Sequence, residues 1–376
     1  MDMERIFHTP EGVRDICQEE CRQKLLIQKK IRRIFHLYGF QDIETPTFEF
    51  FEVFSREVGT TPSKELYKFF DREGNTLVLR PDFTPSIARC AVSCFPLNME
   101  PVRLCYAGNT FVNNSSFQGR MKEATQMGAE RIGDSSSDAD AEMLAMVVNC
   151  LLETGLRDFQ ISVGEVNFFK ALLEDAKKDD EMERKLRELI SNKNNFGVEE
   201  LIRGQNLPKE LENAFFQLPY LFGDAEILKK AKKLTSNQRA IRAIHRLEEI
   251  YEILKCYGYE NYVTFDLGML SKYRYYTGII FQAYTYGTGE PIVKGGRYDN
   301  LLEHFGKAAA ASGFGISIDQ LMLALSRQNI PVTVPEEEEI ILSYTIENRR
   351  DAIVQAVNLR REGKRVILKK LGEEGI

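Results

Sequence analysis

The chain has 376 residues, of which 43% are apolar and 28% are charged. These proportions are typical of a globular protein and argue against extensive disorder, and the length predicts one large domain with smaller additions. The sequence has no apolar run of about 18 residues, and residues 1–12 carry charges and a proline, so it predicts neither a membrane span nor a signal peptide. We therefore expect a cytoplasmic protein.

The charge and the cysteine content narrow the possible functions further. The net charge is −6, whereas a nucleic-acid-binding face usually leaves a basic footprint, so the balance argues weakly against such a partner. The seven cysteines include two pairs spaced by four, Cys17 with Cys21 and Cys90 with Cys94, but no CxxC. With only four histidines in the chain, this spacing favours buried or unreactive thiols over a metal site.

The first predicted elements are a helix and a set of strands. Residues 19–38 carry apolar side chains at a helical period, and Gly39 is placed to end the helix. Its apolar stripe requires a sheet to cover. Short apolar or alternating runs at 76–79, 102–106 and 125–132 predict strands of a largely antiparallel sheet.

A second amphipathic helix is predicted over residues 139–153, with Gly155 at its end. Asp134, Asp138 and Asp140 lie just before it and in its first turn, where carboxylates cap a helix and complement its dipole. A calcium loop is the alternative, but it needs a glycine turn and a closing bidentate glutamate. Capping is therefore the preferred interpretation.

Charged, helical sequence dominates residues 170–255, which we interpret as an insertion into a β-rich core. Strand character returns at 262–284 and 291–294, and residues 313–318 lead into a helix near Asp319. A polar hinge containing Pro331 and Pro335 follows. Beyond it, one strand–helix–strand unit is predicted at 340–344, 349–361 and 365–369, and such a unit cannot bury both faces of its own sheet.

Several segments, in this order, resemble histidyl-tRNA synthetase, the class II enzyme that activates histidine with ATP. They are GFQDIETP at 39–46, LRPDFT at 79–84, the block 108–130, YYTG at 275–278, GGRYD at 295–299 and GFGISI at 313–318. The resemblance runs from about Gly12 to Ser326. It implies an α+β fold with a class II antiparallel sheet flanked by helices, and a dimer interface near Pro46. The implied domains are a catalytic-core-like domain at 1–330, with the insertion at 170–255, and a truncated anticodon-binding-like βαβ segment at 336–376.

The family's amino-acid pocket can be transferred onto this chain residue by residue. The resemblance implies that Asp82, where the family has Glu, accepts the histidine ammonium together with Thr84 and Gln126. It implies also that the imidazole is held by Glu130 with Tyr276 of the Tyr275–Tyr276 pair, and that Tyr298 closes the site. An amino-acid site does need a carboxylate for the ammonium and convergent polar groups in an apolar cleft.

The family's phosphate-binding positions differ. The arginine of the second motif is replaced by Val112 in FVNN, the arginine of the histidine-specific segment by Ser271 in SKYR, and the final arginine of the third motif by Gln320. Arg120 remains, and Lys272 or Arg274 could substitute only in part. Activating histidine with ATP requires phosphate charge to be neutralised, and one preorganised donor contributes about 2.7–4 kcal/mol, so we expect the chemistry to be lost.

A retained amino-acid site without activation resembles the ATP phosphoribosyltransferase regulatory subunits, which are paralogues of the synthetase. This resemblance implies a non-catalytic, cofactor-free subunit that binds histidine as an allosteric effector. It implies a homodimer within a hetero-oligomer, with the short-form catalytic subunit as partner in histidine biosynthesis and with neither tRNA nor a membrane as partner. The alternatives are an active synthetase with relocated arginines, and a detached domain that senses uncharged tRNA, which would require a basic face.

Overall fold

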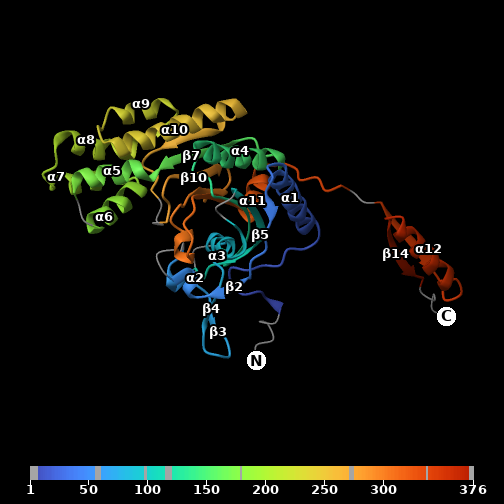
Figure 1. Ribbon diagram of the computed structural model, residues 1–376. Coiled ribbons are helices and arrows are strands. Elements are labelled where there is room, and N and C mark those ends of the chain that lie inside the picture. The colour runs from blue at the N-terminus through green and yellow to red at the C-terminus, as the bar shows by residue number, and fades with distance from the viewer. Residues whose placement is uncertain are drawn as a thin grey trace. The chain divides into compact units, whose positions relative to one another are not determined.

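The computed structural model describes residues 7–55, 61–96, 100–114, 121–177, 180–270, 275–335 and 338–371 (Figure 1). The chain divides into two compact units, Met1–Val332 and Thr333–Ile376. No helix among the described residues combines the length and the apolar character that crossing a bilayer requires.

The first unit is built around a nine-stranded sheet in which the middle strands are antiparallel, while β1 with β5 and β7 with β9 run parallel. In order across the sheet, the strands are β1 (Gln41–Asp42), β5 (Val102–Phe111), β6 (Glu123–Ile132), β12 (Ala311–Ser317), β11 (Val293–Arg297), β10 (Ile279–Thr285), β7 (Phe159–Glu165), β9 (Val263–Asp266) and β8 (Phe222–Gly223). This largely antiparallel sheet confirms the predicted fold class.

The two faces of this sheet have different covers. The helices α1 (Gln18–Leu37) and α4 (Ser137–Glu153) pack together on one face, where Ile27, Ile31 and Cys105 are fully buried. Because side chains alternate along a strand, Leu104 and Tyr106 of β5 point to the other face, where α3 (Thr84–Cys94) covers them. The candidate site residues lie on this second face.

The helix α4 begins differently from the predicted capping. The side chain that caps it is Ser136, whose Oγ accepts a hydrogen bond from the Ala139 N–H at 3.1 Å. Asp140 in the first turn is completely buried and binds arginines, and Asp138 is exposed. Asp134 and Asp140 therefore neither cap the helix directly nor form a calcium loop, because arginine side chains bind their oxygens.

A separate three-stranded sheet ends at Leu79, the first residue of the LRPDFT segment, which then leads into α3. Its order is β2 (Phe48–Phe50), β4 (Thr76–Leu79), β3 (Lys68–Phe70), all antiparallel, and α2 (Glu52–Ser55) follows β2. The strand predicted at 76–79 is confirmed, but it pairs outside the main sheet. Short 3₁₀ turns within the described residues include η2 (Ser63–Glu65), η3 (Leu218–Tyr220), η4 (Glu260–Tyr262) and η5 (Leu302–Phe305).

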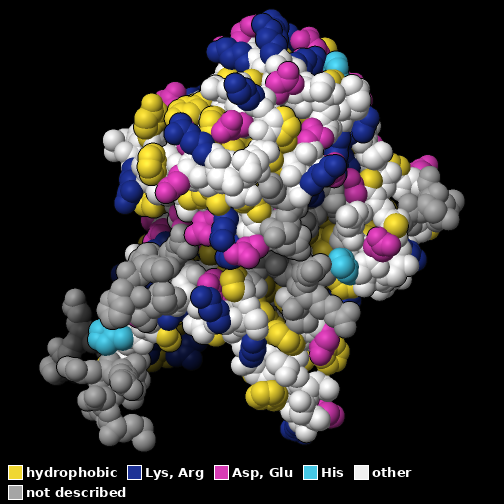
Figure 2. All heavy atoms as spheres, turned by 90° about the vertical axis from the view of Figure 1, so that its left-hand side faces the viewer, with side chains coloured by type: hydrophobic (Ala, Val, Ile, Leu, Met, Phe, Trp, Pro, Cys, Tyr) yellow, Lys and Arg dark blue, Asp and Glu magenta, His cyan; other side chains and the backbone are white. Residues whose placement is uncertain are grey.

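The helices between β7 and β9 gather at the opposite end of the sheet from α1 (Figure 1). They are α5 (Val166–Ala176), α6 (Asp180–Ser191), α7 (Asn195–Arg203), α8 (Lys209–Gln217), α9 (Glu226–Lys232) and α10 (Gln238–Tyr257). We call this segment the helical insertion; it contains one short strand, β8. Acidic and basic side chains alternate over the face that Figure 2 presents, and several form ion pairs within one helix, such as Arg203 with Glu199 at 3.0 Å.

The first unit ends with α11 (Ile318–Arg327), which starts directly from β12. The second unit is the predicted βαβ arrangement, with β13 (Glu339–Tyr344), α12 (Arg349–Arg361) and β14 (Arg365–Lys370), and its two strands pair in parallel. Ala352, Ala356 and Val366 are buried between helix and strands. Ile341 and Ile367 pair on the other face of this small sheet and are 56% and 42% exposed.

Candidate functional site

A buried carboxyl group lies at the centre of the face that α3 covers. Glu130 of β6 is 1% exposed, and its Oε1 accepts a hydrogen bond from Thr84 Oγ1 at 2.8 Å. Its Oε2 accepts a short hydrogen bond from the Tyr298 hydroxyl. Burial raises the pKa of Glu130 to about 8, the two hydroxyl hydrogen bonds lower it in part, and the charge of Asp82 raises it further. The group can therefore hold or release a proton near neutral pH.

Two glycines of β12 make room for the polar side chains of β6. Gly313 is paired with Glu130, and a Cβ atom added to it would collide with Glu130 Oε2. A Cβ atom on Gly315 would collide in the same way with Gln126 Nε2. The two glycines of the GFGISI segment therefore contribute to the site by leaving space for the side chains of Glu130 and Gln126.

Aromatic rings surround this carboxyl group. Tyr275 and Tyr276 stack with ring centroids 4.2 Å apart, and Tyr275 meets Tyr298 edge-on at 6.0 Å. Burial raises the pKa of Tyr275 and Tyr298 well above 10, so their hydroxyls remain protonated donors. Gly296 of the GGRYD segment lies against Tyr276, because an added Cβ atom would come within 2.6 Å of its ring.

Asp82 is half-buried at the edge of these groups, before α3. Its Oδ1 accepts a hydrogen bond from the Thr84 N–H at 3.4 Å, and its charge raises the pKa of Glu130, Tyr275 and Tyr298. The structure thus brings together every residue that the resemblance assigns to the amino-acid pocket. We call this set the Glu130 cluster: Asp82, Thr84, Gln126, Glu130, Tyr275, Tyr276 and Tyr298.

Sequence reasoning missed one member of this neighbourhood, Tyr106. Its hydroxyl accepts a hydrogen bond from Gln126 Nε2 at 3.0 Å, and its ring stacks on Phe83 at 4.2 Å. The guanidinium of Arg80 lies 4.0 Å from the centre of the Phe83 ring. The feature that identifies Tyr106 as a neighbour of the site is the register of β5 with β6, in which Leu104 is paired with Glu130 and Tyr106 with Gly128. One sequence does not reveal that register.

The positions that correspond to the family's phosphate-binding arginines carry no cation where they are described. Val112 follows β5, and its backbone N–H bonds the Lys122 carbonyl at 2.9 Å. Gln320 lies in the first turn of α11, and its Oε1 is buried without a hydrogen-bond partner. The neighbouring Asp319 is held by Lys24 at 3.1 Å. Ser271, Lys272, Arg274 and Arg120 lie outside the described residues.

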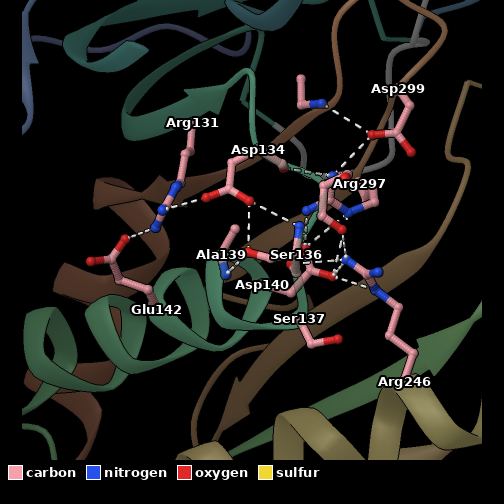
Figure 3. A network of polar contacts seen from close by, with 12 residues as sticks. Arg131, Asp134, Ser136, Ser137, Ala139, Asp140, Glu142, Arg246, Arg297 and Asp299 are labelled. Carbon is pink, nitrogen blue, oxygen red and sulfur yellow. Dashed lines mark hydrogen bonds and ion pairs between the residues drawn. The ribbon is translucent and has the colours of Figure 1, made fainter. Parts of the chain in front are cut away.

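A buried ion-pair network underlies the segment that carries Tyr298 (Figure 3). Arg297 is 3% exposed, and its Nη2 donates to Asp140 Oδ1 at 2.7 Å. Arg246 of α10 contacts the other Asp140 oxygen at 2.6 Å. Arg297 Nη1 also donates to Asp299 Oδ1 at 3.0 Å. A linked group of ion pairs joins Arg131 to Asp134 and Glu142.

One group of possible metal ligands lies elsewhere, among the residues that the structure describes. Donor atoms of His36, Asp42 and Cys105 lie within 4.8 Å of one another. Arg32 Nε is 3.4 Å from Asp42 Oδ1, and burial raises the pKa of the Cys105 thiol to about 12. The arginine charge and the protonated thiol both disfavour a cation, so we assign no metal there.

Comparison with known proteins agrees with this architecture. The histidyl-tRNA synthetase family model matches residues 12–321. A histidyl-tRNA synthetase from Nostoc sp. PCC 7120 superposes with a TM-score of 0.79 at 20% identity, covering 98% of this chain and 87% of that one, which shows a shared fold. The fold and the family match define a protein with the class II core of histidyl-tRNA synthetase.

Closer relatives specify the family further. An ATP phosphoribosyltransferase regulatory subunit from Acetivibrio thermocellus is 41% identical over 357 residues, which cover 95% of this chain and 85% of the relative. A Bacillus halodurans C structure described as an ATP phosphoribosyltransferase regulatory subunit/histidyl-tRNA synthetase has a TM-score of 0.88 at 34% identity, covering 99% and 95% of the two chains. The chain belongs to the family of ATP phosphoribosyltransferase regulatory subunits, which supports a regulatory role in histidine biosynthesis.

Proposed function

We propose that this chain is a non-catalytic regulatory subunit that binds histidine in the Glu130 cluster. It would partner the short-form catalytic subunit of ATP phosphoribosyltransferase, support its activity and transmit feedback inhibition by histidine. The observation that carries the proposal is a contrast: polar groups converge on the buried Glu130, whereas Val112 and Gln320 stand where phosphate-binding cations are expected.

The chemistry of the cluster suits an amino acid with an imidazole ring. Asp82 contributes a carboxylate that suits an ammonium group and lies next to Thr84. Glu130 has a pKa near 8, so it can share a proton with an imidazole, whose own pKa is near 6.5. Bound histidine would replace hydroxyl hydrogen bonds to Glu130 with imidazole hydrogen bonds, while the Tyr275 and Tyr276 rings offer apolar contact.

The alternative is an active histidyl-tRNA synthetase with relocated arginines. Neither Val112 nor Gln320 supplies a positive charge, and α11 presents Asp319 next to Gln320, already bound to Lys24. Positioned cations contribute most of the stabilisation of a transferring phosphate group. The chain therefore favours binding without activation, and the mixed charges of the face in Figure 2 add no support for tRNA binding.

Feedback requires that histidine bind one state of the assembly better than another, with a coupling of typically about 1–3 kcal/mol. We propose that the chain forms a homodimer within that assembly, through the surface that follows Pro46. There Phe48 and Phe50 of β2 are 51% and 54% exposed, and Phe48 meets Phe69 edge-on at 5.7 Å. Exposed aromatic faces of this kind mark protein interaction sites.

The decisive experiment is calorimetric titration of the chain with histidine, followed by ATP–pyrophosphate exchange on the same sample. We expect histidine binding and no exchange, and then histidine-sensitive activity when the chain is combined with the short catalytic subunit. Histidinol, which lacks the carboxylate, and glutamine, which lacks the ring, serve as ligand controls. Histidine-dependent exchange would show instead an active synthetase, and absence of binding would refute the proposal.

A further inference from the structure

Two arginines of α10 reach from the helical insertion toward the tyrosines of the Glu130 cluster. Arg239 and Arg246 are seven residues apart, which places them on the same face of the helix, nearly two turns from each other. Their side chains are 37% and 25% exposed, whereas Glu130 and Tyr298 are almost completely buried. The two arginines therefore connect the protein surface with the buried cluster.

Arg246 acts on the segment that carries Tyr298. Its Nη2 contacts Asp140 Oδ2 at 2.6 Å and donates to the carbonyls of Ser135 and Ser136 at 2.8 and 3.0 Å. The other Asp140 oxygen binds Arg297, the residue directly before Tyr298 (Figure 3). Asp140 is completely buried, so each arginine balances part of a charge that cannot reach water.

Arg239 acts in the same way on the segment that carries Tyr276. Its Nη2 donates to Asn167 Oδ1 at 2.7 Å, and Asn167 Nδ2 donates to the carbonyl of Thr277 at 2.7 Å. Thr277 directly follows Tyr276. The Thr277 N–H donates to the Arg297 carbonyl at 2.8 Å, so the two tyrosine segments are also bonded to each other.

Asp299 provides a second link between the segment of Tyr276 and the segment of Tyr298. Its Oδ2 accepts from Thr277 Oγ1 and its Oδ1 from Arg297 Nη1, both at 3.0 Å. The backbone around Tyr276 and Tyr298 thus forms one hydrogen-bonded unit, and α10 holds this unit at two points. Movement of α10 would change the positions of the Tyr276 and Tyr298 side chains relative to Glu130, because buried polar networks have few alternative arrangements.

We propose that Arg239 and Arg246 are positioning residues through which the helical insertion sets the histidine affinity of the Glu130 cluster. This inference rests on the proposed function and adds a regulatory element to it. A partner that displaces α10 would weaken or strengthen histidine binding without touching the cluster.

The test compares Arg239→Ala, Arg246→Ala and the double variant with Arg242→Ala, which removes an exposed arginine from the same helix. Histidine affinity is measured by calorimetry. Amide hydrogen exchange of residues 275–281 and 295–299 is measured without histidine. We expect each single change to weaken binding by about 3- to 10-fold and the double change by up to about 30-fold, with faster exchange in both segments.

Arg246→Lys keeps the positive charge beside Asp140 but cannot make the full set of guanidinium hydrogen bonds, so it should restore part of the affinity. This rescue separates positioning from a general loss of stability. The proposal is overturned if exchange in the double variant equals that of Arg242→Ala, or if exchange rises while the affinity stays within twofold of that control. If the unmodified chain binds no histidine, the proposed function fails, and the exchange comparison alone decides whether α10 positions the tyrosines.

Discussion

The proposed amino-acid half of the site, around Glu130, and the positions of the family's phosphate-binding arginines, Val112 and Gln320, are built very differently. Around Glu130, hydroxyl groups satisfy both carboxylate oxygens, glycines clear the space, and tyrosines pack closely. Val112 and Gln320 are instead held through their backbone N–H groups, and the buried amide oxygen of Gln320 has no hydrogen-bond partner. Polar groups converge in the first half, whereas the described positions of the second half carry no cation.

The difference agrees with the proposal that this fold can retain binding without catalysis. Recognising an amino acid needs a few convergent groups, which one face of β6, β11 and β12 can hold. Neutralising a triphosphate needs several cations from separate segments, and these can be lost without disturbing the first set. The contrast can be tested from both halves.

The largest effect is expected for Glu130→Ala. This change removes the central hydrogen-bonding group, so the dissociation constant for histidine should rise by about 100-fold, the equivalent of a charged hydrogen bond. Histidine should no longer inhibit the complex with the catalytic subunit, while assembly stays intact. Calorimetry measures the affinity, an activity assay of the complex measures the inhibition, and sedimentation measures the assembly, with Glu199→Ala on the surface of α7 as the control. Unchanged inhibition would contradict the assignment of the site.

Gly313→Ala should damage the same half without removing any polar group. The added Cβ atom would collide with Glu130 Oε2, so the carboxyl group must move away from Thr84 and Tyr298. We expect about tenfold weaker histidine binding and a loss of about 1–3 kcal/mol in the free energy of unfolding. Gly289→Ala is the matched control, because its Cβ atom would meet nothing within 4 Å. Equal behaviour of both variants would show that the spacing at Gly313 is unimportant.

The pH dependence of stability provides a test that needs no ligand. Folding raises the pKa of Glu130 from its ordinary value to about 8, so the folded chain retains a proton that the unfolded chain releases. This contribution to stability is complete below the ordinary glutamate pKa, near 4.3, and is lost as the pH rises through about 8.

In denaturant unfolding, Glu130→Gln should remove a slope of up to about 1.4 kcal/mol per pH unit within that window. Burial also raises the pKa of Glu165, to about 7. Glu165→Gln should therefore reduce the slope of the unfolding free energy only in the lower part of the pH window. Identical pH profiles for Glu130→Gln and the unmodified chain would contradict the assigned pKa.

The smallest effect is expected in the phosphate half. Val112 lies four residues beyond Gly108, the strand partner of Gln126, and is therefore roughly 13 Å along the strand direction from that member of the Glu130 cluster. Val112→Arg should therefore leave the histidine dissociation constant within about twofold and should not restore pyrophosphate exchange. Gln320→Arg, measured beside it, should behave alike. A change above about fivefold in histidine affinity would show that the two halves are coupled after all.

Periodicity in the sequence is sufficient to predict the helices and strands named here, but it does not predict which strands pair with one another. The helix at 19–38 and the strands at 102–106 and 125–132 follow from apolar spacing, and they appear as α1, β5 and β6. The strand at 76–79 was also predicted, yet its pairing in a separate sheet was not. A period of two reports which residues share a face, and it does not identify the neighbouring strand.

The candidate site shows the same limit. The residues of the Glu130 cluster came from motif resemblance, and the fold brings them together. Tyr106 could not be found, because it is recognised only through its register with Gly128. Asp140 was interpreted as a helix-capping group, since a carboxylate in a first turn usually serves that purpose, but its arginine partners come from segments more than 100 residues away.

The second unit has a consequence for handling the protein. Its two-stranded sheet leaves apolar Ile341 and Ile367 exposed, and within the described residues both strands have an unpaired edge. Such edges can recruit strands from other molecules and start aggregation. Lys369 and Lys370 on β14 oppose this, because like charges repel when two copies approach. The chain should therefore associate through these edges more readily when those lysines are neutralised by acetylation.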